Sequence, residues 1–221
     1  MPRQLPKTDR FPAAKRSMAG GYMQTATTGL EQYLQDFSAL LKKVELTEVE
    51  TLVDLLTDAY RNDRFVFIIG NGGSGANASH FCQDLGKGTL HDFDKQKRLK
   101  VMSLTDNTAY ILAYGNDLGY DRIFVEQLKN FVQRDAVLIA ISGSGNSPNI
   151  LRAVEWANAN GVKTVGITGY DGGKLKKMCH HGVHVPSFNM GVVEAVHAVI
   201  FHYLLDTLYK RFKTVASAVG E

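Results

Sequence analysis

The chain has 221 residues, of which 44% are hydrophobic, and carries a formal net charge of +3. This length and apolar content suffice to bury one sizeable core, so we expect a single α/β domain with helical additions rather than two small domains. The slight charge, from 25 Lys and Arg against 22 Asp and Glu, comes without a basic stripe interleaved with aromatic residues, which argues against a nucleic-acid partner.

Nothing in the sequence predicts a membrane or secreted protein. No stretch approaches the roughly 20 apolar residues of a membrane span, and the N-terminus lacks the apolar core of a signal peptide. Cys82 and Cys179 have no metal-site spacing and are interpreted as reduced thiols. We therefore expect a cytoplasmic protein with no membrane partner.

The N-terminal part combines a tail with two helices. Residues 1–20 mix Pro, Gly and basic residues without apolar periodicity, which predicts a disordered tail before one domain over residues 21–221. Helical apolar spacing runs from about Tyr22 to Val44, and Thr47 to Glu50 matches a capping box that opens a second helix ending near Arg61. Both helices lie outside the β/α alternation, so their apolar stripes pack on the sheet or on a partner subunit, and we expect a homo-oligomer.

A strand, a glycine turn and a helix follow between Arg64 and Gly88. The apolar run from Phe65 to Ile69 predicts the strand, and GNGGSG predicts the turn. The turn lacks the register of a dinucleotide fingerprint, and no Gly-Lys-Ser/Thr follows as a phosphate loop requires. The N–H groups of the first helical turn, with Asn71 and Ser74, instead suit a small anionic or oxygen-rich ligand.

His80 and Asp84 stand one helical turn apart on the helix that follows this turn. Their side chains share a face, so the pair predicts a base or two metal ligands near the bound ligand. An ordinary surface contact between His and Asp has the same spacing, and this alternative stays open.

The middle of the chain contains a charged loop and then a second strand. Residues 86–100 are charged and irregular, and their lysines are typical of a solvated loop. Val101 to Leu104 predicts a short strand. A helical segment from about Thr108, a turn-rich stretch from Tyr114 to Asp121 and an amphipathic helix to about Val132 come next.

A second strand–turn–helix unit begins at Ala136. Ala136 to Ile141 predicts a buried strand, Ser142 to Ser147 a turn, and Pro148 the first residue of a helix with Ser147 as its N-cap. Three serine hydroxyls and the helix N–H groups converge there, which suits a phosphate without any Lys or Arg. A serine-rich turn with a good cap is the alternative interpretation.

The last part of the chain repeats the alternation. Thr164 to Thr168 predicts a strand, Gly169 to Gly173 a turn, Gly182 to Val185 a last strand, and about Met190 to Phe212 a helix. Alternating strands and helices predict a parallel sheet covered on both faces, with ligands at the carboxyl ends of the strands.

The final helix carries Glu194, His197 and His202 among apolar residues. Glu194 and His197 share a face, whereas Glu194 and His202 lie eight residues apart, or about 12 Å along the axis. One site can take both only from neighbouring subunits or through a break in the helix. A satisfied core histidine is the alternative for either His alone, and apolar surroundings predict shifted pKa values for such groups.

Five blocks of the sequence resemble one known family. GNGGSGANASHFCQDL, YGNDLGYDRIF, ISGSGNSPNILRAVEWA, TGYDGGKL and EAVHAVIFH are similar, in order, to the sugar isomerase (SIS) domain of phosphoheptose isomerases. The resemblance implies a flavodoxin-like αβα sandwich and a homotetramer with active sites between subunits. It also implies the conversion of sedoheptulose 7-phosphate to D-glycero-D-manno-heptose 7-phosphate.

The resemblance also implies roles for individual residues. The first substrate loop holds Asn71, Gly72 and Gly73, the second Asn116 and Asp117, and the phosphate loop Ser142, Gly143, Ser144 and Ser147. The zinc ligands are His80, Asp84, Glu194 and His202, with one Zn²⁺ per subunit. Asp84 and His202 match the catalytic base and acid, and Asp84 and Glu194 also match substrate-binding positions.

Two of these positions depart from the family pattern. The family has Glu at the position of Asp84 and Gln at the position of Glu194, and a basic residue expected shortly after the first is displaced, with Lys87 and Gly88 nearby. Two His and two carboxylates still form a suitable zinc set, and the added charge favours a divalent cation. The departures leave two alternatives: isomerisation of a different sugar phosphate, or a non-catalytic role similar to that of the SIS-domain tetramer that associates with DnaA.

Overall fold

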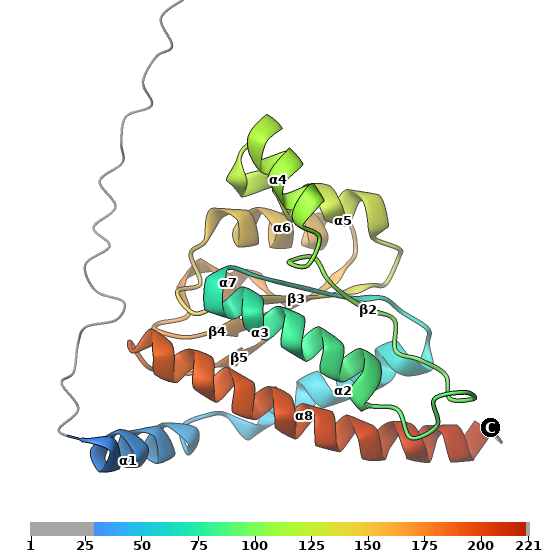
Figure 1. Cartoon of the computed structure of the whole chain (residues 1–221), viewed down its shortest axis with the longest axis horizontal. Coiled ribbons are helices and arrows are strands. Elements are labelled where there is room, and N and C mark those ends of the chain that lie inside the picture. Colours follow the sequence, from blue (N-terminus) through green and yellow to red (C-terminus); the bar gives the residue numbers. More distant parts are fainter. Residues whose placement is uncertain (1–28, 220–221) are drawn as a thin grey trace, which may run out of the picture.

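One parallel sheet forms the centre of the structure (Figure 1). The computed structural model describes residues 29–219, so the predicted tail and the expected start of the first helix lie outside the described residues. The strand order is β2-β1-β3-β4-β5, with all neighbours parallel. The strands are β1 (Val66–Gly70), β2 (Val101–Ser103), β3 (Val137–Ser142), β4 (Lys163–Thr168) and β5 (His181–His184).

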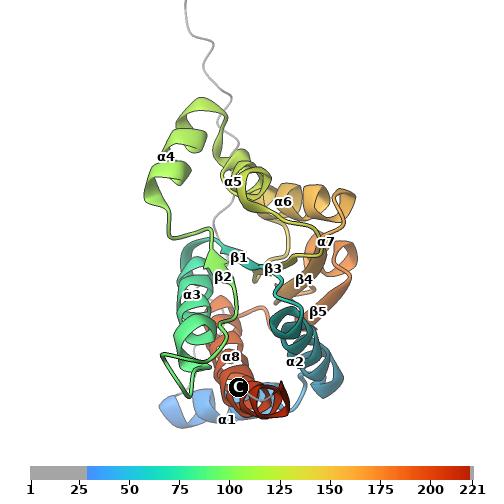
Figure 2. The same ribbon diagram turned by 90° about the vertical axis from the view of Figure 1, so that its right-hand side faces the viewer.

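Helices cover both faces of this sheet (Figure 2). On one face lie α2 (Leu46–Arg61), α3 (Gly72–Gln83) and α8 (Met190–Val219), and α1 (Leu30–Leu41) packs against α8. On the other face lie α5 (Val125–Phe131), α6 (Pro148–Ala159) and α7 (Gly173–Met178), while α4 (Thr108–Asp117) projects from it and has no buried residue. The layers and the strand order confirm the expected flavodoxin-like αβα sandwich, in which the order of strand addition reverses between β1 and β3.

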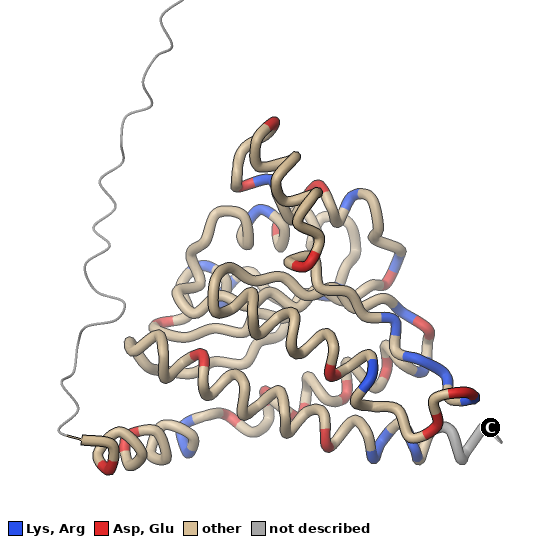
Figure 3. The backbone as a smooth tube through the Cα atoms, in the orientation of Figure 1, with Lys and Arg blue, Asp and Glu red and all other residues tan. Residues whose placement is uncertain are grey.

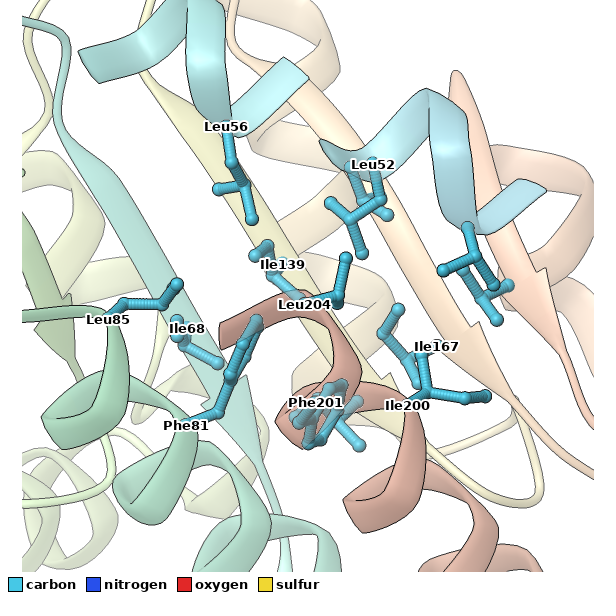
Figure 4. Packing of buried hydrophobic residues seen from close by; sticks show 14 of the residues in the cluster. Leu52, Leu56, Ile68, Phe81, Leu85, Ile139, Ile167, Ile200, Phe201 and Leu204 are labelled. Carbon is cyan, nitrogen blue, oxygen red and sulfur yellow. The ribbon is translucent and has the colours of Figure 1, made fainter. Parts of the chain in front are cut away.

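Alternate strand residues fill two cores, because successive side chains of a strand point to opposite faces. Ile68, Ile139 and Ile167 pack with residues of α2, α3 and α8 (Figure 4). Phe67 and Leu138 pack with residues of α5 and α6 on the other face. Full burial of one such side chain contributes about 1.5–3 kcal/mol. Burial on both faces therefore explains why these strands are continuous apolar runs in the sequence.

Four helical segments differ from the sequence prediction. The capping box predicted at Thr47 is wrong: α2 begins at Leu46, its N-cap Glu45 makes no side-chain cap bond, and the Thr47 carbonyl accepts a 2.8 Å bond from Thr51. α4 continues to Asp117, through a stretch predicted as turn-rich. α7 is a short helix that the sequence analysis does not predict, and α8 extends beyond Phe212 to Val219.

The hydropathy of α8 corrects the expectation that no stretch of the chain approaches the length and apolar character of a membrane span. Met190–Val215 is long and apolar enough to cross a membrane, with mean hydropathy 1.3. In this fold, however, Val193, Val196, Leu204 and Leu208 are fully buried in the core formed by the sheet and α2. The apolar character of α8 is therefore that of a core helix.

The basic segment before β2 is anchored to the end of α2. Figure 3 shows a run of Lys and Arg there, within residues 95–100. The Lys97 ammonium lies 5.7 Å from the ring centroid of Tyr60 and donates to the Arg61 carbonyl at 3.2 Å. Lys100 forms an ion pair with Asp63. These contacts agree with the predicted loop rather than with a binding patch.

Candidate active site

Two of the predicted loops meet in one pocket of about 250 Å³ at the carboxyl ends of β1 and β3. This is the switch point of the sheet, where ligands bind in folds of this kind. The lining comes from the loop after β1, from the serine loop after β3 and from the start of α8. Its residues are Asn71, Gly72, Gly73, Ser74, Ile141, Ser142, Gly143, Ser144, Ser147, Met190 and Glu194.

Two glycines let α8 approach the loops closely. A Cβ on Gly73 would overlap the Glu194 carboxylate, and a Cβ on Gly143 would overlap the Met190 sulfur and lie 3.0 Å from its Cε. A larger residue at either position therefore requires Glu194 or Met190, both of which line the pocket, to move. The glycine pattern that the sequence analysis assigns to ligand approach also serves this helix packing.

The serine loop has the form of an anion site. Ser147 is the N-cap of α6 and Pro148 its first residue, as predicted, but the Ser147 side chain makes no capping hydrogen bond. Ser142, Ser144 and Ser147 all line the pocket beside the start of the helix. The pocket lining contains neither Lys nor Arg. An anion placed there would meet serine hydroxyls and the backbone N–H groups at the positive end of the helix dipole.

The turn after β4 supports the serine loop from behind. The N–H of Leu175 donates to the Gly145 carbonyl at 3.0 Å, and the N–H of Lys174 donates to Asn146 Oδ1 at 3.2 Å. Gly145 has φ +62°, a left-handed conformation that favours glycine. These contacts with α7 therefore hold the shape of the serine loop, which is the candidate anion site.

Glu194 contributes a carboxylate to a pocket that otherwise offers donors. It is partly buried, and this burial raises the pKa of its carboxyl group above the ordinary value. The side chain lies against Gly73, so it closes the pocket on the α8 side.

Asn149 and Tyr120 hold the Asn71 side chain in place, and the sequence analysis singles out neither of them. The amides of Asn71 and Asn149 exchange hydrogen bonds of 2.9 and 2.8 Å, and the Tyr120 hydroxyl donates to Asn71 Oδ1 at 3.1 Å. Asn149 is only 1% exposed, a rare position for an amide. The sequence signal is a polar residue two positions after the helix cap, which by itself is too common to single out.

Asn116 and Asp117 do not reach this pocket. They lie at the exposed end of α4, where Asn116 Nδ2 donates to Asp117 Oδ1 at 2.8 Å. Neither residue belongs to the lining of the serine-loop pocket in the described chain. Their assignment to a substrate loop stays a prediction.

A second group, formed by His80, Asp84 and His202, has the composition of a metal centre. Asp84 Oδ2 lies 3.5 Å from His80 Nε2 and 3.8 Å from His202 Nε2, and one ligand atom of each residue lies within 4.8 Å of the others. Bonds of about 2.0–2.2 Å to a tetrahedral zinc ion place ligand atoms about 3.4 Å apart. Small side-chain movements would therefore let these three residues bind one metal ion.

Helix packing brings these three side chains together. The rings of Phe81 and Phe201 stack at 4.3 Å and join α3 to α8, one residue beyond His80 and one before His202. A π-helical turn, η1 (Asp84–Gly88), begins at Asp84 and continues α3. Such turns are frequent at functional sites. Asp84 is buried, whereas the side chains of His80 and His202 are 53% and 55% exposed, so the open side of the group faces away from the chain.

The pocket and the metal group lie at different levels of the same two helices. Gly73 and Asp84 are eleven residues apart, or about 16 Å along α3, and Glu194 and His202 are about 12 Å apart along α8. α8 is continuous, which excludes the break considered in the sequence analysis. Glu194 is accordingly not a member of the group formed by His80, Asp84 and His202 within the described chain.

Comparisons with known proteins agree with this geometry. The SIS domain family model matches residues 32–169. The phosphoheptose isomerase of Helicobacter pylori is 35% identical over 185 residues, which cover 82% of this chain and 94% of that protein. The phosphoheptose isomerase of a Nitratiruptor species is 36% identical over 156 residues, covering 70% of this chain and 81% of that protein.

Solved structures give the same result. A phosphoheptose isomerase from Francisella tularensis has a TM-score of 0.75 at 28% identity, covering 81% of this chain and 96% of that one. The phosphoheptose isomerase from Neisseria gonorrhoeae has a TM-score of 0.73 at 27% identity, covering 80% and 95%. The chain therefore belongs to the SIS domain family and, within it, to the phosphoheptose isomerase group.

Proposed function

We propose that this protein is an aldose–ketose isomerase that converts sedoheptulose 7-phosphate to D-glycero-D-manno-heptose 7-phosphate. The observation that carries the proposal is the pairing of a cation-free serine-loop pocket with the group His80, Asp84 and His202 in a phosphoheptose isomerase relative. The pocket suits a phosphate, and the group suits proton transfer beside a metal ion.

The serine loop binds the phosphate of the substrate. Hydroxyls of Ser142, Ser144 and Ser147 and the N–H groups at the start of α6 donate to its oxygens, with Gly143 allowing close approach. Asn71, Gly72 and Gly73 hold sugar oxygens at the other side of the pocket, and Glu194 accepts from a sugar hydroxyl. Binding through the phosphate orients the carbonyl end of the sugar for reaction.

Asp84 and His202 carry out the proton transfers. The Asp84 carboxylate removes the proton from C1 of the ketose, the electron pair of that C–H bond forms the C1–C2 double bond of a cis-enediol, and His202 donates a proton to O2. Return of the proton from Asp84 to C2, with loss of the O1 proton to His202, gives the aldose. General acid–base catalysis of this kind contributes about 10²–10⁴ in rate.

A zinc ion, one per subunit, is the metal that His80, Asp84 and His202 would hold, and two imidazoles with a carboxylate suit it. When bound, zinc polarises the carbonyl and hydroxyl oxygens of the sugar. Glu194 of a neighbouring subunit would supply the fourth ligand, because within one chain Glu194 lies about 12 Å from His202 along α8.

The functional protein is a cytoplasmic homotetramer with its active sites between subunits. This assembly is supported by the separation of pocket and metal group along α3 and α8, and by the exposure of His80 and His202. Exposed apolar side chains lie nearby on α8 at Val199 and Tyr203. Asn116 and Asp117, which lie away from the pocket of their own chain, belong to the pocket of another subunit in this arrangement.

Incubation of the purified protein with sedoheptulose 7-phosphate tests the proposal, with zinc added in one arm and EDTA in the other. We expect the protein to form the aldose phosphate, and we expect EDTA to abolish this turnover. A folded tetramer without turnover in either arm would contradict it. A panel of other sugar phosphates then separates a different isomerase from a non-catalytic SIS-domain protein.

A further inference from the structure

Asn71 lies between two pockets at the switch point of the sheet. It lines the serine-loop pocket and also a second pocket of about 320 Å³, to which Ser79, Thr105 and Tyr120 contribute. Its amide is held from two directions. Asn149 comes from the first turn of α6, and Tyr120 from the 3₁₀ turn η2 (Tyr120–Arg122), which an ion pair between Asp121 and Arg152 joins to α6.

The orientation of the Asn71 amide is set by a backbone group. Two amides that exchange hydrogen bonds keep both bonds if both flip, so the pair alone does not define which atom is oxygen. The N–H of Ile150, however, points at Asn149 Oδ1 at 3.0 Å, and an N–H can only donate. Asn149 must therefore present its oxygen there, and Asn71 must place its own Nδ2 toward that same oxygen.

This orientation leaves Asn71 one free hydrogen-bonding group. An amide offers two acceptor sites and two N–H donors. Both acceptor sites of Asn71 Oδ1 are taken, by Asn149 and Tyr120, and one N–H is donated to Asn149. Within residues 29–219, none of these hydrogen bonds uses the second N–H of the Asn71 amide. The Asn71 side chain can therefore meet a ligand only as a donor.

We infer that Asn149 is a positioning residue, which fixes the Asn71 amide so that Asn71 presents a single N–H to an oxygen of the sugar phosphate. The identity of the ligand rests on the proposed function, whereas the amide pair does not. Burial makes the arrangement rigid, because reversal of Asn149 would leave the Ile150 N–H without an acceptor inside the protein.

A double-mutant cycle between Asn71 and Asn149 tests this inference. Asn149→Leu removes both amide bonds, and Asn149→Ser keeps a hydroxyl for the Ile150 N–H but is too short to reach Asn71. Each is expected to lower kcat/KM for sedoheptulose 7-phosphate about 10- to 100-fold, the cost of misplacing a contact by about 1 Å. On an Asn71→Ala background, each should cost less than about threefold more, because Asn149 acts through Asn71. A loss of kcat/KM in the double variant equal to the product of the two single losses would overturn the inference.

Two further variants separate positioning from a general effect on α6. Tyr120→Phe removes the other donor to Asn71 Oδ1 at an exposed position, and a loss of about 2- to 5-fold is expected from one neutral hydrogen bond. Asn158→Leu is the matched control, since its amide lies on the same helix and bonds to Met178 and Thr164 instead. A loss for Asn158→Leu as large as that for Asn149→Leu would contradict the inference.

Failure of the proposed function gives a different result. If the wild-type protein does not turn over the sugar phosphate, the same cycle is measured on the midpoint of urea unfolding. Losses that are smaller in the double variant than the sum of the single losses support the amide pair, and additive losses overturn it.

Discussion

Asp84→Asn is the substitution that separates the proposed proton transfer from binding. Asparagine keeps the size of the side chain beside His80 and His202, whose Nε2 atoms lie 3.5 and 3.8 Å from Asp84 Oδ2. The amide cannot take a proton from carbon, and it is a weaker metal ligand than a carboxylate. The expected loss in kcat is about 10²–10⁴-fold, which corresponds to about 2.7–5.5 kcal/mol of barrier.

The assay is initial-rate turnover of saturating sedoheptulose 7-phosphate, together with zinc content by mass spectrometry. Asp206→Asn is the matched control, because Asp206 is an exposed carboxylate one helical turn after His202 and is not part of the metal group. The control should keep wild-type turnover. Turnover of Asp84→Asn within tenfold of wild type, at equal zinc content, would refute Asp84 as the base.

Three other measurements test the pocket, the helix packing and the buried histidine. Gly143→Ala places a Cβ against the Met190 sulfur, so calorimetry should find sugar-phosphate binding at least about tenfold weaker with the fold unchanged. Phe81→Ala removes the stack on Phe201 and should lower the free energy of unfolding by about 3–5 kcal/mol in urea titrations. Burial lowers the pKa of His197 to about 4, from an ordinary 6.5, so the folded state binds this proton less tightly than the unfolded state. Stability should therefore be complete above pH 6.5 and fall by about 2 kcal/mol by pH 5, a slope that His197→Gln should reduce.

The strands and the serine loop could be predicted because local rules determine them. Buried parallel strands are continuous apolar runs, and the run from Ala136 to Ile141 matches β3 within one residue. Ser147 and Pro148 occupy the predicted N-cap and first position of α6, since proline has a fixed φ that suits the first helical position and no N–H that needs a partner there.

The remaining features depend on contacts between distant residues. The pair Asn71 and Asn149 joins positions 78 residues apart, and no local pattern marks it. The capping box at Thr47 fails because α2 already begins at Leu46, before the position that the pattern requires, and Glu50 of that box instead accepts a hydrogen bond from the Tyr203 hydroxyl on α8 at 2.8 Å. Tertiary bonding of this carboxylate replaces the local bond that the sequence pattern indicates.

The separation of pocket and metal group allows a direct test of sites shared between subunits. The stacked rings of Phe81 and Phe201 join α3 and α8 beside the metal group, and no break in α8 shortens the distance to the pocket. A pocket of one chain should therefore work with the metal group of another. Asp84→Asn and Gly143→Ala would then each be impaired alone, but co-assembled in equal amounts they should regain about a quarter of wild-type turnover, because random pairing unites two intact halves at that frequency. Co-assembled tetramers whose turnover stays at the mean of the two parent variants would place both halves of the site in one chain.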